Sequence, residues 1–144
     1  MIYLDASALF SLYLPDANTP VAISLTTAAD APLLITPLCE LETVNAFRLR
    51  VFRKELPALS VENAVRDLEG DIRSGVLLLR PLPEGSFSRA GILAKALTPA
   101  IGVRAVDLLH VAAALELSVG SFYTFDQKQH RTAQAAGLKT NPLP

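Results

Sequence analysis

The chain has 144 residues, a formal net charge of −1 and a hydrophobic content of 51%, which fits one domain with a substantial core and excludes a disordered chain. Its single cysteine, Cys39, cannot form an internal disulfide, no apolar run reaches the ~18 residues of a membrane span, and the amino terminus lacks a signal-peptide pattern. We therefore expect residues 1–144 to form one cytoplasmic domain with no membrane partner.

The first apolar run, Ile2 to Leu4, ends directly in Asp5. Its β-branched and aromatic residues, without polar alternation, predict a short strand that is covered on both faces. Residues 6–10 resemble the start of a helix. Asp5 is therefore expected at the carboxyl end of a strand, where open α/β sheets bind their ligands, although Asp is also a common helix cap.

Short apolar runs and helical patterns alternate along the rest of the chain. Further strands are expected at 33–36, 76–80, 121–125 and 138–141. Helices are expected at 19–30, 38–55, 60–74, 85–97, 104–118 and 127–136, with the segment TPAIG ending the helix at 97. Strands that alternate with helices predict an α/β fold, a single domain with a central parallel five-stranded sheet flanked by helices.

The stretch 38–74 is expected to form a helical hairpin, in which Pro57 separates two helices and Ser60 caps the second. Its inward stripes are expected to consist of Leu41, Val44, Phe47, Val51, Val61, Ala64, Leu68 and Ile72. The basic residues of the segment RLRVFRK within it are interpreted as a solvated helix face rather than as a nucleic-acid patch.

Four acids are expected at one edge of the sheet. Asp5 and Asp126 each follow a strand, whereas Glu42 and Asp107 lie in early turns of helices, and in a parallel α/β sheet these positions share the edge at which the strands end. Carboxylates ~4 Å apart repel by ~4 kcal/mol per pair at an effective dielectric near 20, so such a cluster needs a cation or shared protons. All-oxygen ligands favour Mg²⁺ or Mn²⁺ over zinc. We expect these acids to be both metal ligands and catalytic residues for phosphodiester hydrolysis.

Other polar residues accompany these acids. Ser7 and Thr124 are expected to orient a carboxylate or to bind a water, with turn and cap chemistry as the alternative. Asn45 stands three residues after Glu42 and is expected to share its helix face. His110 stands in an otherwise apolar helix and is interpreted as a hydrogen-bonded core residue rather than as a catalytic base.

Over essentially its whole length the sequence resembles the PIN-domain nucleases, and among them the small VapC-type toxins. The segments that carry the resemblance are MIYLDASAL, TPLCELETVNA, RAVDLLHVAAAL and FYTFDQKQ. Each is similar to a segment that supplies one acid in the family, and all four occur in the family's order. The segment CELE offers both Glu40 and Glu42, of which Glu42 matches the family pattern better.

This resemblance implies a metal-dependent endoribonuclease that acts on RNA, forms a homodimer and is silenced by a cognate antitoxin. We expect an Arg or Lys of the antitoxin to pair with Asp5 and Asp107. Its apolar residues need a groove, and the expected wall of this groove is the hairpin 38–74, with Leu49 and Phe52 off its main stripe. A homodimer contact is the alternative use of the same surface.

Two other functions compete with this interpretation. A phosphatase of the haloacid-dehalogenase type also begins with a strand that runs into an Asp, but it needs a second acid two residues later, where Ser7 stands. A catalytically silent PIN-like binding module should have lost an acid, and all four are present.

Overall fold

The computed structural model describes residues 1–143. Its elements in chain order are β1 (Ile2–Leu4), α1 (Ala6–Tyr13), α2 (Thr19–Thr27), β2 (Leu33–Ile35), α3 (Pro37–Phe52), α4 (Ala58–Ser74), β3 (Leu77–Leu79), α5 (Ser86–Ile101), α6 (Ala105–Glu116), β4 (Ser121–Tyr123), α7 (Gln127–Ala135) and β5 (Lys139–Thr140). All the expected strands and helices are present, with small shifts at most of their ends. Within the described range, no helix is both long and apolar enough to span a membrane.

The strands form one parallel sheet in the order β3-β2-β1-β4-β5, which confirms the predicted parallel five-stranded sheet. In the centre, Tyr3 of β1 is in register with Leu34 of β2 and Phe122 of β4. The chain builds the sheet to one side as far as β3 and then continues on the other side of β1 with β4 and β5. Ligands of open α/β sheets bind beyond the carboxyl ends of the strands at such a reversal, here between β1 and β4.

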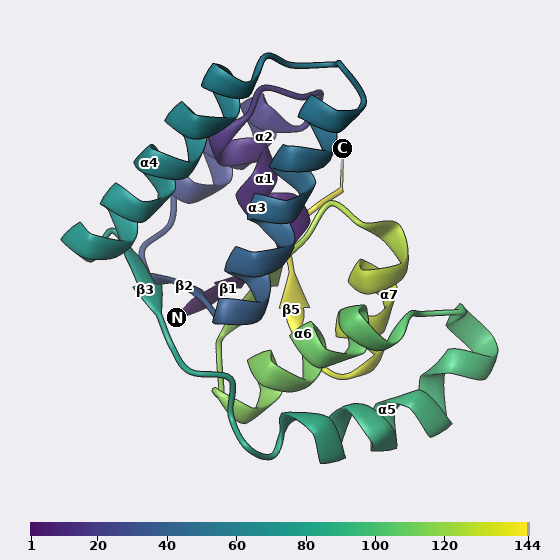
Figure 1. Cartoon of the computed structure of the whole chain (residues 1–144). Coiled ribbons are helices and arrows are strands. Elements are labelled where there is room, and N and C mark those ends of the chain that lie inside the picture. The colour runs from purple at the N-terminus through teal and green to yellow at the C-terminus, as the bar shows by residue number, and fades with distance from the viewer. Residues whose placement is uncertain (144) are drawn as a thin grey trace.

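Helices cover both faces of the sheet (Figure 1). Ile2 and Leu4 of β1 pack in a core with residues of α1, α3 and α4, whereas Tyr3 packs in a second core with residues of α6 and α7. Successive residues of a strand point to opposite faces, so a strand covered on both sides needs an unbroken apolar run. This explains why the segment before Asp5 shows no polar alternation.

Helices α3 and α4 form the predicted helical hairpin, and Phe47, Val61 and Leu68 of the expected stripes are buried. Helix α4 begins at Ala58, with Pro57 as its N-cap residue. The prediction that Ser60 caps this helix is therefore wrong. Pro57 has the extended backbone of an N-cap residue, with φ −69° and ψ 148°, and its side chain has no hydrogen-bonding group, so the helix starts without a side-chain cap.

The prediction that Leu41 faces inward is also wrong, because its side chain is 68% exposed. The buried residues of α3 are Cys39, Thr43 and Phe47, which are four apart and therefore share one face of the helix. Two of them are small because α3 lies close to β1 and α1 there. The Cys39 thiol donates to the Leu4 carbonyl at 3.2 Å.

Helix α5 continues through Pro99 to Ile101 and does not end at 97 as predicted from the segment TPAIG. Proline lacks the amide hydrogen that would bond the carbonyl of Lys95, four residues earlier. Lys95 lies on the exposed side of the helix, so the lost bond falls at the surface and not in the core. The helix ends instead at Gly102, whose φ of 69° is readily adopted only without a Cβ atom.

Candidate active site

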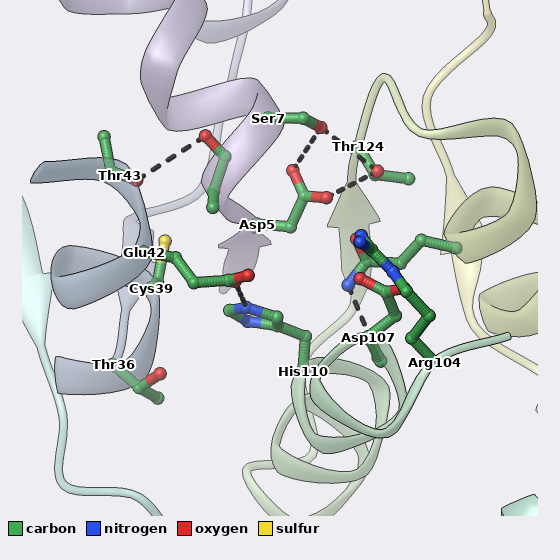
Figure 2. A network of polar contacts seen from close by, with 12 residues as sticks. Asp5, Ser7, Thr36, Cys39, Glu42, Thr43, Arg104, Asp107, His110 and Thr124 are labelled. Atoms are coloured by element: carbon green, nitrogen blue, oxygen red, sulfur yellow. Dashed lines mark hydrogen bonds and ion pairs between the residues drawn. The ribbon is translucent and has the colours of Figure 1, made fainter. Parts of the chain in front are cut away.

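Asp5 lies where β1 meets α1, and its carboxylate is 1% exposed. As the N-cap residue of α1, it accepts at Oδ1 from the Ala8 amide at 2.8 Å and from the Ser7 hydroxyl at 2.7 Å. Its Oδ2 accepts from the Thr124 hydroxyl at 2.6 Å (Figure 2). Burial raises the pKa of Asp5, although these three hydrogen bonds act in the opposite direction. Asp5 is therefore both a helix cap and a poorly solvated carboxylate.

Ser7 and Thr124 join the ends of β1 and β4. The Ser7 hydroxyl oxygen accepts from the Phe125 amide at 2.8 Å and lies 3.3 Å from the Thr124 hydroxyl oxygen. The Thr124 amide donates to Asn141 Oδ1 at 2.8 Å, which ties the end of β4 to the chain after β5. Both hydroxyls thus contact Asp5, and the Thr124 hydroxyl oxygen also accepts from the Asp126 amide at 3.0 Å, which is a local turn contact.

Glu42, in the second turn of α3, reaches across to α6. One of its carboxylate oxygens lies 2.5 Å from Nε2 of His110 (Figure 2). His110 is 1% exposed, which confirms its interpretation as a buried, hydrogen-bonded residue. Its other ring nitrogen, Nδ1, lies 2.9 Å from the Tyr3 hydroxyl, which in turn lies 2.9 Å from the Thr36 hydroxyl.

The acid at the end of this network sets the direction of its hydrogen bonds. An ionised Glu42 only accepts, so His110 donates from Nε2, and a neutral ring then accepts the Tyr3 hydroxyl at Nδ1. Burial raises the pKa of Tyr3 well above its usual range, so this phenol keeps its proton. Thr36 is the N-cap residue of α3 but makes no side-chain cap bond. Its hydroxyl instead contacts Tyr3, so three elements together hold the Glu42 carboxylate.

The other two predicted acids stand at helix starts. Asp107, in the first turn of α6, accepts from Nε of Arg104 at 3.1 Å, and Asp126, the N-cap residue of α7, accepts from the Gln129 amide at 2.8 Å. The hydrogen bond and the negative charge of Asp107 raise the pKa of Arg104, and Asp126 and Glu42 add smaller effects of the same sign. Arg104 is therefore the counter-ion of Asp107.

All four predicted acids line one cavity of about 140 Å³. We call it the acid cavity, and its lining residues are Asp5, Ala6, Ser7, Glu42, Arg104, Asp107, Asp126 and Gln129. It lies at the carboxyl edge of the sheet, beyond β1 and β4. Within residues 1–143, however, no three Asp, Glu, His or Cys side chains are arranged as a group that would hold a metal ion as they stand. Instead, each carboxylate has partners of its own. The hydroxyls of Ser7 and Thr124 contact Asp5, His110 contacts Glu42, and Arg104 contacts Asp107.

Three residues from the sequence analysis do not line this cavity, namely Thr124, Asn45 and Glu40, although Thr124 contacts Asp5. Asn45 is exposed and does not line it. Glu40 lines a different hollow of about 300 Å³, with residues of α3 and α4. The structure thus brings Glu42 and not Glu40 to the other three acids.

The sequence analysis missed two partners of the acids, Arg104 on Asp107 and His110 on Glu42. Arg104 was not considered, and the contact of His110 with Glu42 was not foreseen. One signal was available, because Tyr3 places a hydroxyl in an otherwise apolar strand, and a buried hydroxyl needs a partner. Its partners stand 33 and 107 positions away in the sequence, so no local pattern identifies them.

Comparison with known proteins bears on this site. A family model described as PIN domain matches residues 2–135. No curated protein sequence is significantly similar to this chain.

Several solved structures share the fold. VapC20 from Mycobacterium tuberculosis, described as a toxin that cleaves the sarcin–ricin loop, is 17% identical and superposes with a TM-score of 0.71 over 96% of both chains. FitAcB from Neisseria gonorrhoeae is 15% identical, with a TM-score of 0.67 over 99% of this chain and 97% of that chain. FitAB bound to an IR36 DNA fragment is 19% identical, with a TM-score of 0.70 over 98% and 94%.

Proposed function

This chain belongs to the PIN domain family, and from that premise we propose that it is a metal-dependent endoribonuclease acting as the toxin of a toxin–antitoxin pair. One observation carries the proposal: four acids far apart in the sequence line a single cavity at the carboxyl edge of the sheet. Of the similar structures, VapC20 is described as a toxin that cleaves the sarcin–ricin loop, which supports a nuclease that acts as a toxin.

The donor chemistry of the acid cavity fits a hard divalent cation. Asp5, Glu42, Asp107 and Asp126 offer oxygen ligands only, which suits Mg²⁺ or Mn²⁺. These four residues would hold the ion, and a bound ion would polarise the phosphoryl oxygen and activate a water. Asp5 has the least solvent to balance its charge, so it gains most from a cation.

The remaining residues act on the acids. The hydroxyls of Ser7 and Thr124 fix the orientation of the Asp5 carboxylate, and His110 holds one oxygen of Glu42 while the other stays available. Hydrogen-bonded carboxylates keep one geometry, which a metal site and an in-line displacement both require. We assign the whole chain to this one domain and place the protein in the cytoplasm.

Two rival functions are weaker. A phosphatase of the haloacid-dehalogenase type would use a carboxylate two residues after Asp5. Ser7 stands there instead, and its hydroxyl forms hydrogen bonds with Asp5 and with the Phe125 amide. A silent binding module has no need of four acids around one cavity. Incubation with RNA and with a phosphomonoester, each with and without Mn²⁺, separates the three. The proposal expects metal-dependent cleavage of RNA only, and cleavage of the monoester alone or of neither substrate contradicts it.

We expect Mg²⁺ or Mn²⁺ to raise the melting temperature of the protein, and to raise it less in the Asp126→Asn variant. A ligand that binds only the folded state stabilises it by ~2.7 kcal/mol at 100 times its Kd. Asn still caps α7, so the variant folds but has lost one charged ligand. Differential scanning fluorimetry over a metal titration measures the shifts. Equal shifts in both proteins would show that the ion binds elsewhere.

The partner proposal concerns a groove between α3 and α4. It has a volume of about 640 Å³, and its lining includes Phe52, Val61 and Val65. Phe52 is 82% exposed, whereas Leu49, the other expected wall residue, does not line the groove. We propose that the apolar residues of a cognate antitoxin bind here while one of its cations enters the acid cavity, and that the toxin itself is a homodimer.

We expect Phe52→Asp to weaken the complex with the product of the adjacent reading frame by ~30-fold or more, since the loss of a central aromatic contact costs ~2 kcal/mol or more. Leu59→Asp is the matched control, because Leu59 is also an exposed residue of the hairpin but lies outside the groove lining. Calorimetry or surface plasmon resonance measures both affinities. An unchanged affinity for the Phe52 variant would remove the groove from the proposal.

A further inference from the structure

A second hollow opens from the acid cavity along α7. It has a volume of about 560 Å³ and is lined by Arg104, Asp107, Phe125, Asp126, Gln127 and Lys128. Arg104, Asp107 and Asp126 also line the acid cavity, so the two spaces adjoin. We call this space the basic hollow, because Arg104 and Lys128 line it.

One nitrogen of the Arg104 guanidinium is engaged by Asp107, and its two terminal nitrogens are not. Its Nε donates to Asp107 Oδ2 at 3.1 Å, yet the side chain is 79% exposed. The guanidinium carries four further N–H groups on its two terminal nitrogens, in a planar fork that matches two oxygens of a phosphate. Asp107 lies beside Arg104 and contacts its Nε, so the two terminal nitrogens remain for an anion (Figure 2).

Lys128 supplies the second charge of the basic hollow. It stands in the first turn of α7, is exposed, and its Nζ lies 3.5 Å from the Gly102 carbonyl. This single long contact to a neutral group leaves the ammonium free to pair with an anion. Arg104 and Lys128 therefore offer one bidentate donor and one mobile point charge in the same space.

A third hollow beside the acid cavity has a different character. It has a volume of about 350 Å³ and shares four residues with the acid cavity, Ala6, Ser7, Glu42 and Asp126. Its other lining residues are Phe10, Asp16, Asn18, Ala46 and Phe125. None of these described lining residues is a Lys or Arg. A polyanion that lies over the acid cavity therefore meets positive charge in the basic hollow but not in this third hollow.

Electrostatics makes this asymmetry important. The protein has a net charge of −1, so nothing global attracts RNA, and four acids repel any phosphate near the cavity. A bound divalent ion compensates the scissile phosphate but not its neighbours. A cleavable RNA strand therefore needs local cations for the adjacent phosphate, and the basic hollow is where the described structure provides them beside the acids.

We propose that Arg104 and Lys128 form a binding site for the backbone phosphate next to the scissile one in a single-stranded RNA. This inference rests on the proposed function and adds a direction to it, because the strand leaves the acid cavity on the side of α7. Arg104 has a second effect. Its charge competes with a metal ion for Asp107, so it strengthens RNA binding and weakens metal binding at the same time.

The test measures binding and not cleavage. In an Asp5→Asn background, fluorescence anisotropy follows a labelled single-stranded RNA over a salt series. Each lost phosphate contact should reduce the slope of log K against log salt by ~0.7, and Arg104→Ala and Lys128→Ala should each weaken binding at low salt by about tenfold. In the otherwise unchanged protein, calorimetry should show Mn²⁺ binding more tightly to Arg104→Ala, by up to about fivefold.

Arg89→Ala is the matched control, because Arg89 also pairs through Nε with a carboxylate, that of Glu116 at 2.6 Å, but lies outside both spaces. It should change neither the salt slope nor the Mn²⁺ affinity. Equal slopes for Arg104→Ala and the parent, or the same loss in Arg89→Ala, would overturn the inference while leaving the nuclease proposal intact. A parent protein that binds no RNA at any salt concentration would overturn both.

Discussion

The Asp5→Asn variant is expected to lose cleavage of RNA by ~100-fold or more while keeping its fold. Asp5 is the most deeply buried of the four acids that line the acid cavity, and a neutral amide is a poor ligand for a divalent cation. The loss corresponds to ~3 kcal/mol of transition-state stabilisation, which is modest for a metal ligand. The rate of cleavage of a labelled RNA in Mg²⁺ or Mn²⁺ measures it.

The same variant should be at least as stable as the parent, because the shape of the site is kept. Asn Oδ1 still accepts from Ala8 and Ser7, and its amide donates to Thr124 in place of the bond that Asp5 accepted there. Burial raises the pKa of Asp5 in the folded state, so ionising it favours unfolding as pH rises through that pKa.

The substitution removes this unfavourable ionisation. The gain in melting temperature over the parent, measured without metal, should therefore be larger at pH 7 than at pH 4. Two results contradict these expectations separately. Cleavage at the normal rate would show that Asp5 is not a ligand, and a variant that is less stable at pH 7 would show that the hydrogen bonds of Asp5 outweigh its burial.

The second large effect is expected at His110. His110→Ala should lower the free energy of unfolding by ~2–4 kcal/mol, because it empties a fully buried site and leaves the Tyr3 hydroxyl with Thr36 as its remaining partner. It should also lower the rate of RNA cleavage by ~10–100-fold, since Glu42 loses the contact that orients it. Chemical denaturation gives the first quantity, and cleavage assays well below the melting temperature give the second.

Tyrosine variants separate positioning from stability. Tyr3→Phe removes the hydroxyl that holds His110, and we expect it to lower both stability and cleavage, each less than His110→Ala does. Tyr13→Phe is the matched control, because it removes a hydrogen bond of 2.7 Å to Asp71, and neither residue lines the acid cavity. It should lower stability without changing cleavage. If Tyr3→Phe and Tyr13→Phe affect cleavage equally, the network does not position Glu42.

Much of the fold follows from the sequence alone. The unbroken apolar run from Ile2 to Leu4 indicates a strand that is covered on both faces. The alternation of such runs with helical patterns indicates a parallel sheet. The four acids could be selected because strand ends and helix starts share one edge in that architecture. The inferences about the fold succeed because hydrophobic periodicity and chain direction are local properties, which adjacent residues determine.

Tertiary structure alone decided how the acids are held. The order of the strands places the reversal between β1 and β4, and no local pattern specifies which strands pair. Glu42 and His110 are 68 positions apart, and Asp5 and Thr124 are 119 apart, so their contacts exist only after the sheet has formed. Leu41 was misplaced for a related reason, because packing against β1 and α1 selected another face of α3. Periodicity shows that a helix has a buried side, but the neighbouring elements determine which side it is and which polar groups meet there.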